Sequence, residues 1–341
     1  MWTKARGQGR EPTRVPAART ARRARTGRPS GQSGGNRTLR VATYPPYLDA
    51  PSVSPGGWVK EELESTTDSR MVRAGERDQL LHPAPAARPA DRGRRLSRPT
   101  VDDLVRADAA LGDGGSDLFR EANPDAIGNY DALEEGLAFD SQNRVVPTET
   151  SYISLVYSQN DIDAPKTLDD LLRPAYEGAL LTQDPTRSET GLGFLLRTIE
   201  NKGEDDYLEY WSALQDNGVQ ILGSWSDAYA AYSNGEASIV MSYATDQVFA
   251  ARSDEDVSEH LVAFPNSQSI AYIAGIAGFA GSENTELVDR FTEFMLSPRV
   301  QSKVTVLNVA FPVVTNANLP ANFDDLPHAP QKTISYSYDR L

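Results

Sequence analysis

Residues 180–200, LLTQDPTRSETGLGFLLRTIE, contain the pattern that decides the fold of this chain. Leu180–Gln183 is a short apolar run that is typical of a buried strand. The spacing of apolar residues after Gly191 predicts a helix, with Ser188 or Thr190 close to its start. A polar turn that joins a strand directly to a helix has three interpretations: a helix cap, a catalytic loop or a ligand-binding loop.

The same strand–turn–helix order recurs along the chain from Arg40 onward, and no internal repeat accompanies it. Strands are expected at 39–44, 151–159, 178–183, 219–222, 237–243 and 271–281, and helices at 58–65, 100–111, 167–176, 191–200, 206–218, 225–235 and 284–298. Alternation of this kind predicts an α/β architecture in which helices cover both faces of the sheets.

Composition removes several classes of function. The 341 residues are enough for two ordinary domains, and there is no cysteine to form a disulfide, a thiol nucleophile or a cysteine metal cluster. His82, His260 and His328 lie far apart in the sequence, which argues against a histidine metal site. No run of apolar residues reaches the length of a transmembrane helix; the longest, 270–281, is glycine-rich and predicts a buried strand.

Charge is distributed unevenly. Residues 1–100 contain 20 Lys and Arg against 9 Asp and Glu, whereas residues 101–341 contain 14 against 39. Only six of the 34 basic residues are lysines. An acidic, lysine-poor body suggests a protein that stays soluble at high salt, or an ordinary acidic protein. It argues against nucleic-acid binding by residues 101–341.

Two arginine-rich segments interrupt this picture. Residues 1–38 show almost no apolar periodicity, and residues 69–99 look the same although globular sequence flanks them on both sides. Each segment is either a disordered basic linker or a nucleic-acid-binding arm, or it is read out of frame. We interpret 1–38 as disordered or mis-framed and 66–99 as frame-shifted, with no legible signal peptide near Met1.

Two further turns follow predicted strands. Trp225 stands at one such turn, where an aromatic ring could stack on a ligand or simply belong to the core. The other turn carries Tyr243, Ala244, Thr245 and Asp246, which could hold a cation or cap the next helix. Because carboxyl ends of parallel strands meet at one edge of an α/β sheet, three polar or aromatic turns together favour a ligand cleft.

Catalysis has little support. The chain has no G-x-x-x-x-G-K-[ST] phosphate-binding loop, no G-x-G-x-x-G after a strand and no G-x-S-x-G nucleophile motif. A transferase that works through a thiol nucleophile would need a cysteine, which is absent. We therefore expect a binding protein that is not an enzyme and that uses no cofactor and no metal.

Several motifs resemble the periplasmic-type solute-binding proteins of ABC transporters, and within them the thiamine-binding group. The motifs are QDPTRSETGLGFLL (183–196), WSDAYAAYSNGEASIVMSYATD (225–246), LVDRFTEFMLSPRVQ (287–301) and FPVVTNANLP (311–320). The last two are typical of the superfamily, and the first two are more diagnostic of the thiamine group. The resemblance covers 40–64 and 100–341.

The resemblance implies a two-lobe periplasmic-binding-protein fold, in which each lobe is a mixed sheet flanked by helices and the ligand cleft lies between the lobes. The first lobe is then discontinuous, with residues 39–147 and 266–341, and the second lobe has residues 148–265. The crossovers are placed near Pro147–Ser151 and Pro265–Ile270.

The resemblance also implies an extracytoplasmic receptor, at the cell surface or in the periplasm, with or without a lipid anchor. It would be a monomer that hands thiamine or a thiamine phosphate to an ABC permease and its ATPase subunit. The implied ligand contacts are Tyr44, Ser188, Glu189, Trp225, Tyr243, Ala244, Thr245 and Asp246. A ferric-iron or polyamine receptor of the same superfamily is the alternative. For iron, Tyr336 and Tyr338 are a poor pair of ligands.

Overall fold

A computed structural model describes residues 38–43, 47, 54–76, 95–97, 99–111, 118–252, 255–282, 284–320, 323 and 329–341. Tyr44, and residues 77–94 within the segment interpreted as frame-shifted, lie outside these ranges. Residues 37–341 belong to one compact unit.

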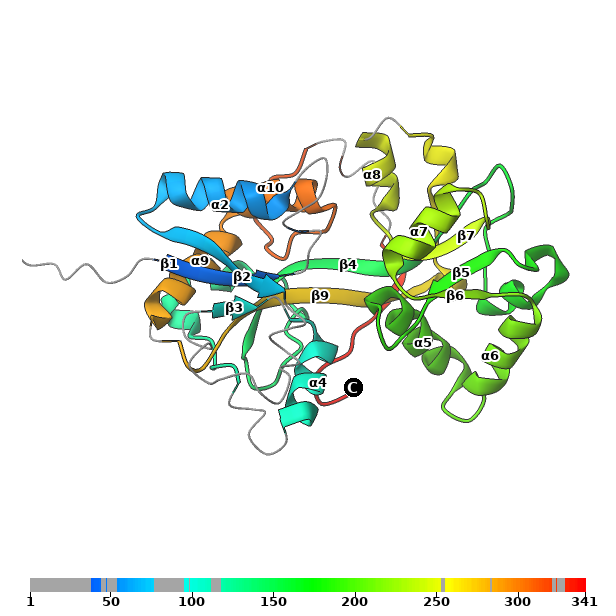
Figure 1. The fold of residues 1–341 in the computed structure, drawn as a ribbon, viewed down its shortest axis with the longest axis horizontal. Helices are drawn as coiled ribbons and strands as arrows, with labels where there is room; N and C mark the ends of the chain where they lie inside the picture. The colour runs from blue at the N-terminus through cyan, green and yellow to red at the C-terminus, as the bar shows by residue number, and fades with distance from the viewer. Residues whose placement is uncertain are drawn as a thin grey trace, which may run out of the picture. The chain divides into compact units, whose positions relative to one another are not determined.

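One mixed sheet organises the described residues. Its strands are β1 (Thr38–Thr43), β2 (Arg70–Glu76), β3 (Arg95–Ser97), β4 (Val145–Tyr157), β5 (Leu180–Gln183), β6 (Gln220–Leu222), β7 (Ile239–Tyr243), β8 (Leu261–Ala263), β9 (Gln268–Gly278) and β10 (Lys332–Ile334). The order is β2-β1-β3-β9-β4-β7-β5-β6, while β10 pairs with β9 and β8 pairs with β4. Neighbours pair in parallel in β2-β1-β3 and in β7-β5-β6, whereas β9 and β4 are antiparallel (Figure 1).

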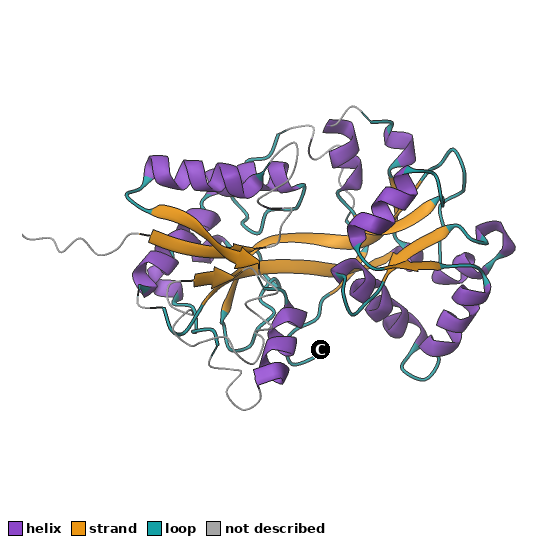
Figure 2. Cartoon of the chain, viewed as in Figure 1, coloured by secondary structure: helices purple, strands orange, loops and turns teal. Residues whose placement is uncertain are grey.

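Helices cover both faces of this sheet, as the alternating sequence pattern predicts (Figure 2). They are α2 (Pro55–Thr66), α4 (Val101–Leu111), α5 (Glu189–Lys202), α6 (Tyr207–Asp216), α7 (Trp225–Ser233), α8 (Asp246–Arg252), α9 (Thr285–Leu296) and α10 (Pro298–Asn308). Short 3₁₀ turns lie at Pro124–Ala126, Tyr130–Ala132, Leu168–Leu172, Pro174–Tyr176, Val257–Glu259 and Pro265–Ser267.

The sheet has two halves with separate cores, which confirms the two-lobe fold. In the first lobe, apolar side chains of β1 and β9 pack with α2, α9 and α10 on one face, and α4 covers another cluster around Phe119 and Phe279. In the second lobe, α5 and α6 pack on one face of β4, β5 and β7, and α7 packs on the other. The boundaries of 147/148 and 265/266 remain predictions.

Strands β4 and β9 join the two lobes. They pair continuously from Val145 opposite Ala277 to Ile153 opposite Ile270, except for a register shift between Pro147 and Glu149. Pro147 cannot donate a backbone hydrogen bond, so an irregularity beside it is expected. Both predicted crossovers therefore lie at or next to strands that run through both halves of the sheet.

The structure corrects three local expectations. The helix expected at 167–176 is two 3₁₀ turns, because Thr167 and Asp170 form a tight capping box and Pro174 prevents the turn from continuing. The helix expected at 225–235, for which the sequence suggests Ser226 as the cap, is instead capped by Ser224, which accepts the Asp227 N–H. The segment 66–99 contributes β2 and β3 to the sheet, where only irregular sequence was expected.

Candidate functional site

The three predicted turns lie side by side because strands β7, β5 and β6 are parallel neighbours. The Asp184 N–H, just after β5, donates to the Leu222 carbonyl at the end of β6, with N and O 2.8 Å apart. The Gln183 side-chain amide donates to the Met241 carbonyl of β7 over 3.0 Å. These bonds tie the ends of all three strands to one edge, as the α/β pattern predicts.

The loop between β5 and α5 is held by its own side chains. Asp184 Oδ1 accepts both the Thr186 N–H and the Thr186 hydroxyl, at 2.9 and 2.7 Å, and these bonds lower the pKa of Asp184. Gly191 sits where an added Cβ would be 2.3 Å from the Gln183 carbonyl oxygen, so only glycine lets α5 begin this close to β5.

Ser188 occupies the N-cap position of α5, yet its side chain makes no capping bond. Its hydroxyl lies 2.9 Å from that of Thr190, which donates to Gln183 Oε1 over 2.6 Å. Because Thr190 gives its proton to Gln183, Ser188 donates to Thr190. The side-chain cap, one of the interpretations of this turn, is therefore not formed, and the half-buried Ser188 hydroxyl retains lone pairs that can accept.

Four aromatic side chains form what we call the aromatic row: Tyr229, Trp225, Tyr243 and Tyr272. Trp225 is the first residue of α7, and its ring centroid is 4.8 Å from that of Tyr229 and 6.4 Å from that of Tyr243. Tyr272, on β9, is 5.6 Å from Tyr243. All four side chains are half-buried, so the row packs inward and still presents ring surface.

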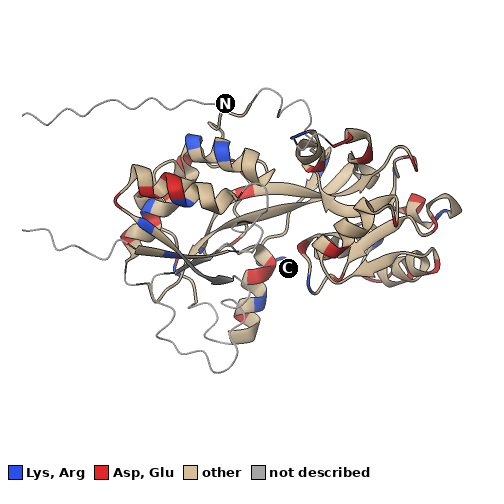
Figure 3. Cartoon of the chain, turned by 45° about the horizontal axis from the view of Figure 1, so that its top comes forward, with Lys and Arg blue, Asp and Glu red and all other residues tan. Residues whose placement is uncertain are grey.

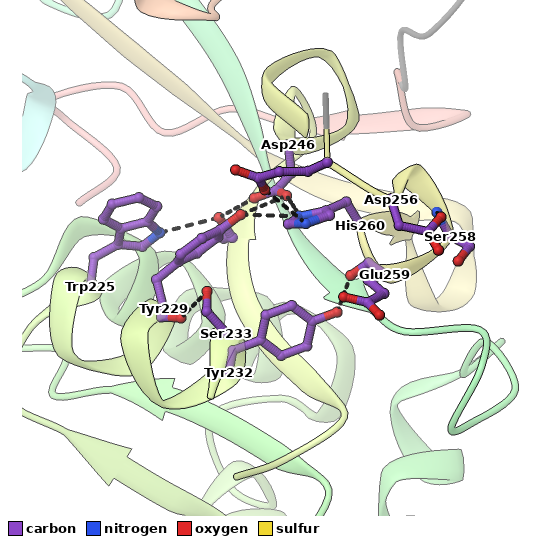
Figure 4. A network of polar contacts seen from close by, with 11 residues as sticks. Trp225, Tyr229, Tyr232, Ser233, Asp246, Asp256, Ser258, Glu259 and His260 are labelled. Carbon is purple, nitrogen blue, oxygen red and sulfur yellow. Dashed lines mark hydrogen bonds and ion pairs between the residues drawn. The ribbon is translucent and has the colours of Figure 1, made fainter. Parts of the chain in front are cut away.

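Asp246, the first residue of α8, is the centre of a buried polar network beneath this row (Figure 4). Its Oδ1 accepts the Tyr229 hydroxyl at 3.0 Å and lies 2.8 Å from His260 Nδ1. Its Oδ2 accepts the Ser242 hydroxyl at 3.2 Å, and Ser242 Oγ in turn accepts the Trp225 indole N–H at 3.1 Å. Asp246 thus orients Trp225 through Ser242.

The network also changes the acidity of its members. The hydrogen bond that His260 makes to the Asp246 carboxylate raises the pKa of His260 above its usual value, although burial opposes the shift. Glu255, whose carboxylate is 3.2 Å from His260 Nε2, acts in the same direction. Burial, with the charge of Asp246 adding to it, raises the pKa of Tyr229. Tyr229 therefore keeps its proton and serves as a donor.

The remaining predicted contacts have different surroundings. Ala244 is fully buried, and its backbone N–H donates to the Tyr152 carbonyl over 2.8 Å. Thr245 is buried at the start of α8, where its carbonyl accepts the Val248 N–H. Glu189 is the half-buried first residue of α5. The prediction for Tyr44 lies outside the described residues.

Sequence reasoning missed four residues that the structure brings to this region: Tyr229, Tyr272, His260 and Arg106. Tyr229 could have been found, because it lies four residues after Trp225 on a predicted helix and so shares its face. Tyr272 and His260 come from distant segments, and no local pattern links them to Trp225. Arg106, on α4 of the first lobe, donates from Nη1 to the Thr186 carbonyl of the second lobe over 3.0 Å.

The iron alternative finds no support in its tyrosines. The Tyr336 hydroxyl donates to Glu200 and the Tyr338 hydroxyl to Asp108, each over 2.7 Å. Among the described residues, no three His, Asp or Glu side chains are grouped as a metal ion would require.

None of the helices described here is long and apolar enough to span a bilayer.

Comparison with protein families matches residues 97–331 to bacterial extracellular solute-binding proteins. Curated relatives include the thiamine-binding periplasmic protein of Escherichia coli, 30% identical over 193 residues, which are 56% of this chain and 58% of the relative. The counterpart in Brucella suis is 26% identical over 312 residues, 87% of this chain and 85% of the relative. The match to the first of these spans little more than half of the relative's length.

Solved structures support the same fold. A periplasmic thiamin binding protein superposes with a TM-score of 0.74 and 23% identity, covering 90% of this chain and 92% of the other. A ferric binding protein from Campylobacter jejuni superposes with a TM-score of 0.66 and 18% identity, covering 87% of this chain and 93% of the other. At these identities the likeness establishes the fold and leaves the ligand open.

Proposed function

Because the chain belongs to the family of bacterial extracellular solute-binding proteins, we propose that it is an extracytoplasmic receptor for thiamine or its phosphates. In this proposal the monomeric receptor delivers its ligand to the permease of an ABC importer, which an ATPase subunit drives. The observation that carries the proposal is the aromatic row above the buried Asp246 carboxylate.

The aromatic row suits a flat cation. Thiamine combines a thiazolium ring, which is permanently positive, with a flat aminopyrimidine. The faces of Trp225 and Tyr243 attract such a cation by about 1–2 kcal/mol each when water is excluded. Asp246 adds negative charge near Trp225, to which Ser242 links it, and it accepts the hydroxyl of Tyr229 in the same row.

The second lobe as a whole also favours a cation. Residues 148–265 contain 21 Asp and Glu against six Lys and Arg, and the positions of acidic residues, red in Figure 3, are spread over this half of the ribbon. A surface with an excess of one charge raises the local concentration of ligands of the opposite charge and accelerates their association.

The β5–α5 loop supplies the complementary end of the proposed site. The N–H groups in the first turn of α5 point out of the helix start, where they favour anions and polar oxygen atoms. Ser188 adds a hydroxyl at the same place. This end would receive the hydroxyethyl group of thiamine or the phosphate of its esters, while the aromatic row holds the rings.

Calorimetric titration of the full chain with thiamine, thiamine monophosphate and spermidine tests the proposal. We expect saturable binding of thiamine or its phosphate and much weaker binding of spermidine, which has no ring to stack. Trp225→Ala should lower the affinity by about 10- to 100-fold, since it removes stacking and one cation–π contact.

Phe249→Ala is the matched control, because Phe249 is an exposed aromatic residue on the neighbouring α8. Its substitution should leave the affinity unchanged. Tight spermidine binding, or full thiamine affinity in the Trp225→Ala variant, would refute the assignment of thiamine to this site.

A further inference from the structure

A small cavity lies on the α5-covered face of the second lobe, away from the proposed ligand site. Its volume is about 20 Å³, and a single water-sized occupant needs about 10–15 Å³ on the same measure. Its lining is mainly apolar and consists of Ile153, Ser154, Leu155, Leu168, Phe194, Arg197, Met241, Ala263, Phe264, Pro265 and Gln268. None of the predicted thiamine contacts is among these residues.

Arg197 is the one cationic residue in this lining. Only 6% of its surface is exposed. Its Nη2 donates to the Pro265 carbonyl over 2.9 Å, and its Nε donates to the Gln268 carbonyl over 3.4 Å. Its Nη1 is buried and has no hydrogen-bond partner among the described residues, where Arg197 also forms no ion pair.

A buried guanidinium without a counter-charge is costly, because arginine does not give up its proton in proteins. Glu200, three residues further along α5, does not fill this role. Its carboxylate is already bonded to the Tyr336 hydroxyl and forms an ion pair with Arg340. Glu200 therefore acts on the Arg197 charge only through space, and the guanidinium itself meets two carbonyl oxygens and the cavity.

We propose that this cavity is a binding site for one small anion, chloride under ordinary conditions, held by Arg197 Nη1. Ser154, which also lines the cavity, has a buried hydroxyl without a hydrogen-bond partner among the described residues and can donate to the same anion. The rest of the lining is mainly apolar and includes Phe194 and Met241. A halide needs one strong donor and tolerates apolar neighbours.

The bound halide would act on the segment that enters β9. Arg197 holds the carbonyls of Pro265 and Gln268, and between them Asn266 and Ser267 have positive φ values of 56° and 57°. Left-handed backbone at two successive non-glycine residues is unfavourable and persists only where surrounding contacts impose it. By neutralising Arg197, the halide stabilises the residue that holds both ends of this turn.

Thermal unfolding of the full chain in chloride or bromide, compared with gluconate at equal ionic strength, tests the site. We expect the halides to raise the Tm by about 2–4 °C at saturation, because they bind the folded state alone. Arg197→Met should abolish the difference between halide and gluconate. Arg290→Met is the control, because it also removes one arginine charge, but at an exposed position on α9. This variant should keep the difference in Tm between halide and gluconate.

Two further measurements keep the test independent of how well Arg197→Met folds. Ala263→Val fills the cavity while keeping the arginine, and it should also remove the halide response. Crystals grown in bromide should show an anomalous peak beside Arg197 Nη1. The proposal would be overturned by a cavity without an anomalous peak, by a water in place of the anion, or by equal Tm values in halide and gluconate. This holds whatever the thiamine titration shows.

Discussion

Asp246 has a role in the structure that its sequence context, which left a helix cap or a cation contact open, did not predict. It is the first residue of α8, and its carboxylate accepts the hydroxyls of Tyr229 and Ser242 and lies beside the ring of His260. The negative charge of the Asp246 carboxylate lowers the electrostatic potential at the neighbouring rings of the aromatic row. The charge therefore belongs to the proposed cation site even though Asp246 itself is buried.

Asp246→Asn should reduce thiamine affinity by about 10- to 100-fold, the effect of losing one interaction with a charged group of roughly 1.5–3 kcal/mol. The amide keeps the shape of the side chain and removes its charge. Calorimetry measures the affinity, with Asp216→Asn on the exposed end of α6 as the control. Equal affinities in the two variants would show that the buried charge does not contribute.

His260 should make stability depend on pH. Its folded-state pKa is raised, chiefly by the hydrogen bond to Asp246, and Glu255 and Glu259 add to the shift while burial opposes it. A raised pKa means that the folded state holds the proton more tightly than the unfolded state. The stabilisation is therefore complete below the unfolded pKa of about 6.5 and is lost as the pH rises through the folded pKa.

Denaturant unfolding of the wild type and His260→Gln between pH 5 and 9 measures this contribution. The wild-type free energy of unfolding should fall relative to that of the variant as the pH rises above about 6.5. The other ionisable groups around His260 are the same in both proteins, so the difference isolates its proton. If the free energies of unfolding of the two proteins differ by the same amount from pH 5 to 9, the proposed pairing of His260 with Asp246 is contradicted.

At the scale of elements, the approach of α5 to β5 determines the position of the loop between them. Gly191 permits that approach, and Gln183 connects the loop to β7 through its amide. The sequence places Gly191 at the start of the predicted helix, and the close approach of α5 to β5 is the reason that a glycine is needed there. What the sequence did not predict is the hydrogen-bonded series from Ser188 through Thr190 to Gln183.

Gly191→Ala should destabilise the fold by about 1–3 kcal/mol, because the new methyl would meet backbone and cannot be avoided by a side-chain rotation. Gly223→Ala, in the loop before α7, is the control, since its methyl would make only ordinary contacts with the side chains of Arg187 at 3.7 Å and Asp227 at 3.9 Å. Urea unfolding compares the two. Similar midpoints would mean that α5 can move away from β5 at little cost.

At the scale of the whole molecule, β4 and β9 connect two separately packed lobes, and a few polar contacts bridge the space beside them. Arg106 makes one of these contacts, since its side chain on α4 donates a hydrogen bond to the Thr186 carbonyl in the loop between β5 and α5. Family members of this fold close on their ligand by hinge motion, and a bridge at the loop would favour the closed arrangement.

Arg106→Ala should lower thiamine affinity only about two- to tenfold and leave stability within roughly 0.5 kcal/mol, because the bond is exposed and single. The matched control is Arg290→Ala, an exposed arginine far from the loop in sequence. Calorimetry gives the affinity, and small-angle scattering of the ligand-bound protein reports closure. Wild-type affinity in Arg106→Ala would exclude a role for this bridge.

The amino-acid sequence by itself determined the α/β class, the strand–turn–helix units and three turns that share a sheet edge. These follow from short-range patterns: apolar periodicity, caps and breakers, together with the rule that parallel strands end on the same side. Trp225, Tyr243 and Ser188 could be singled out because each stands at such a turn.

Only the tertiary structure decided which partners those residues have. Tyr272 joins the aromatic row through the pairing of β9 with β4, and His260 reaches Asp246 from a segment beyond α8. Arg197 faces a cavity because of how α5 packs over the start of β9. Contacts between distant segments depend on the summed packing of the whole chain, so no local stretch encodes them.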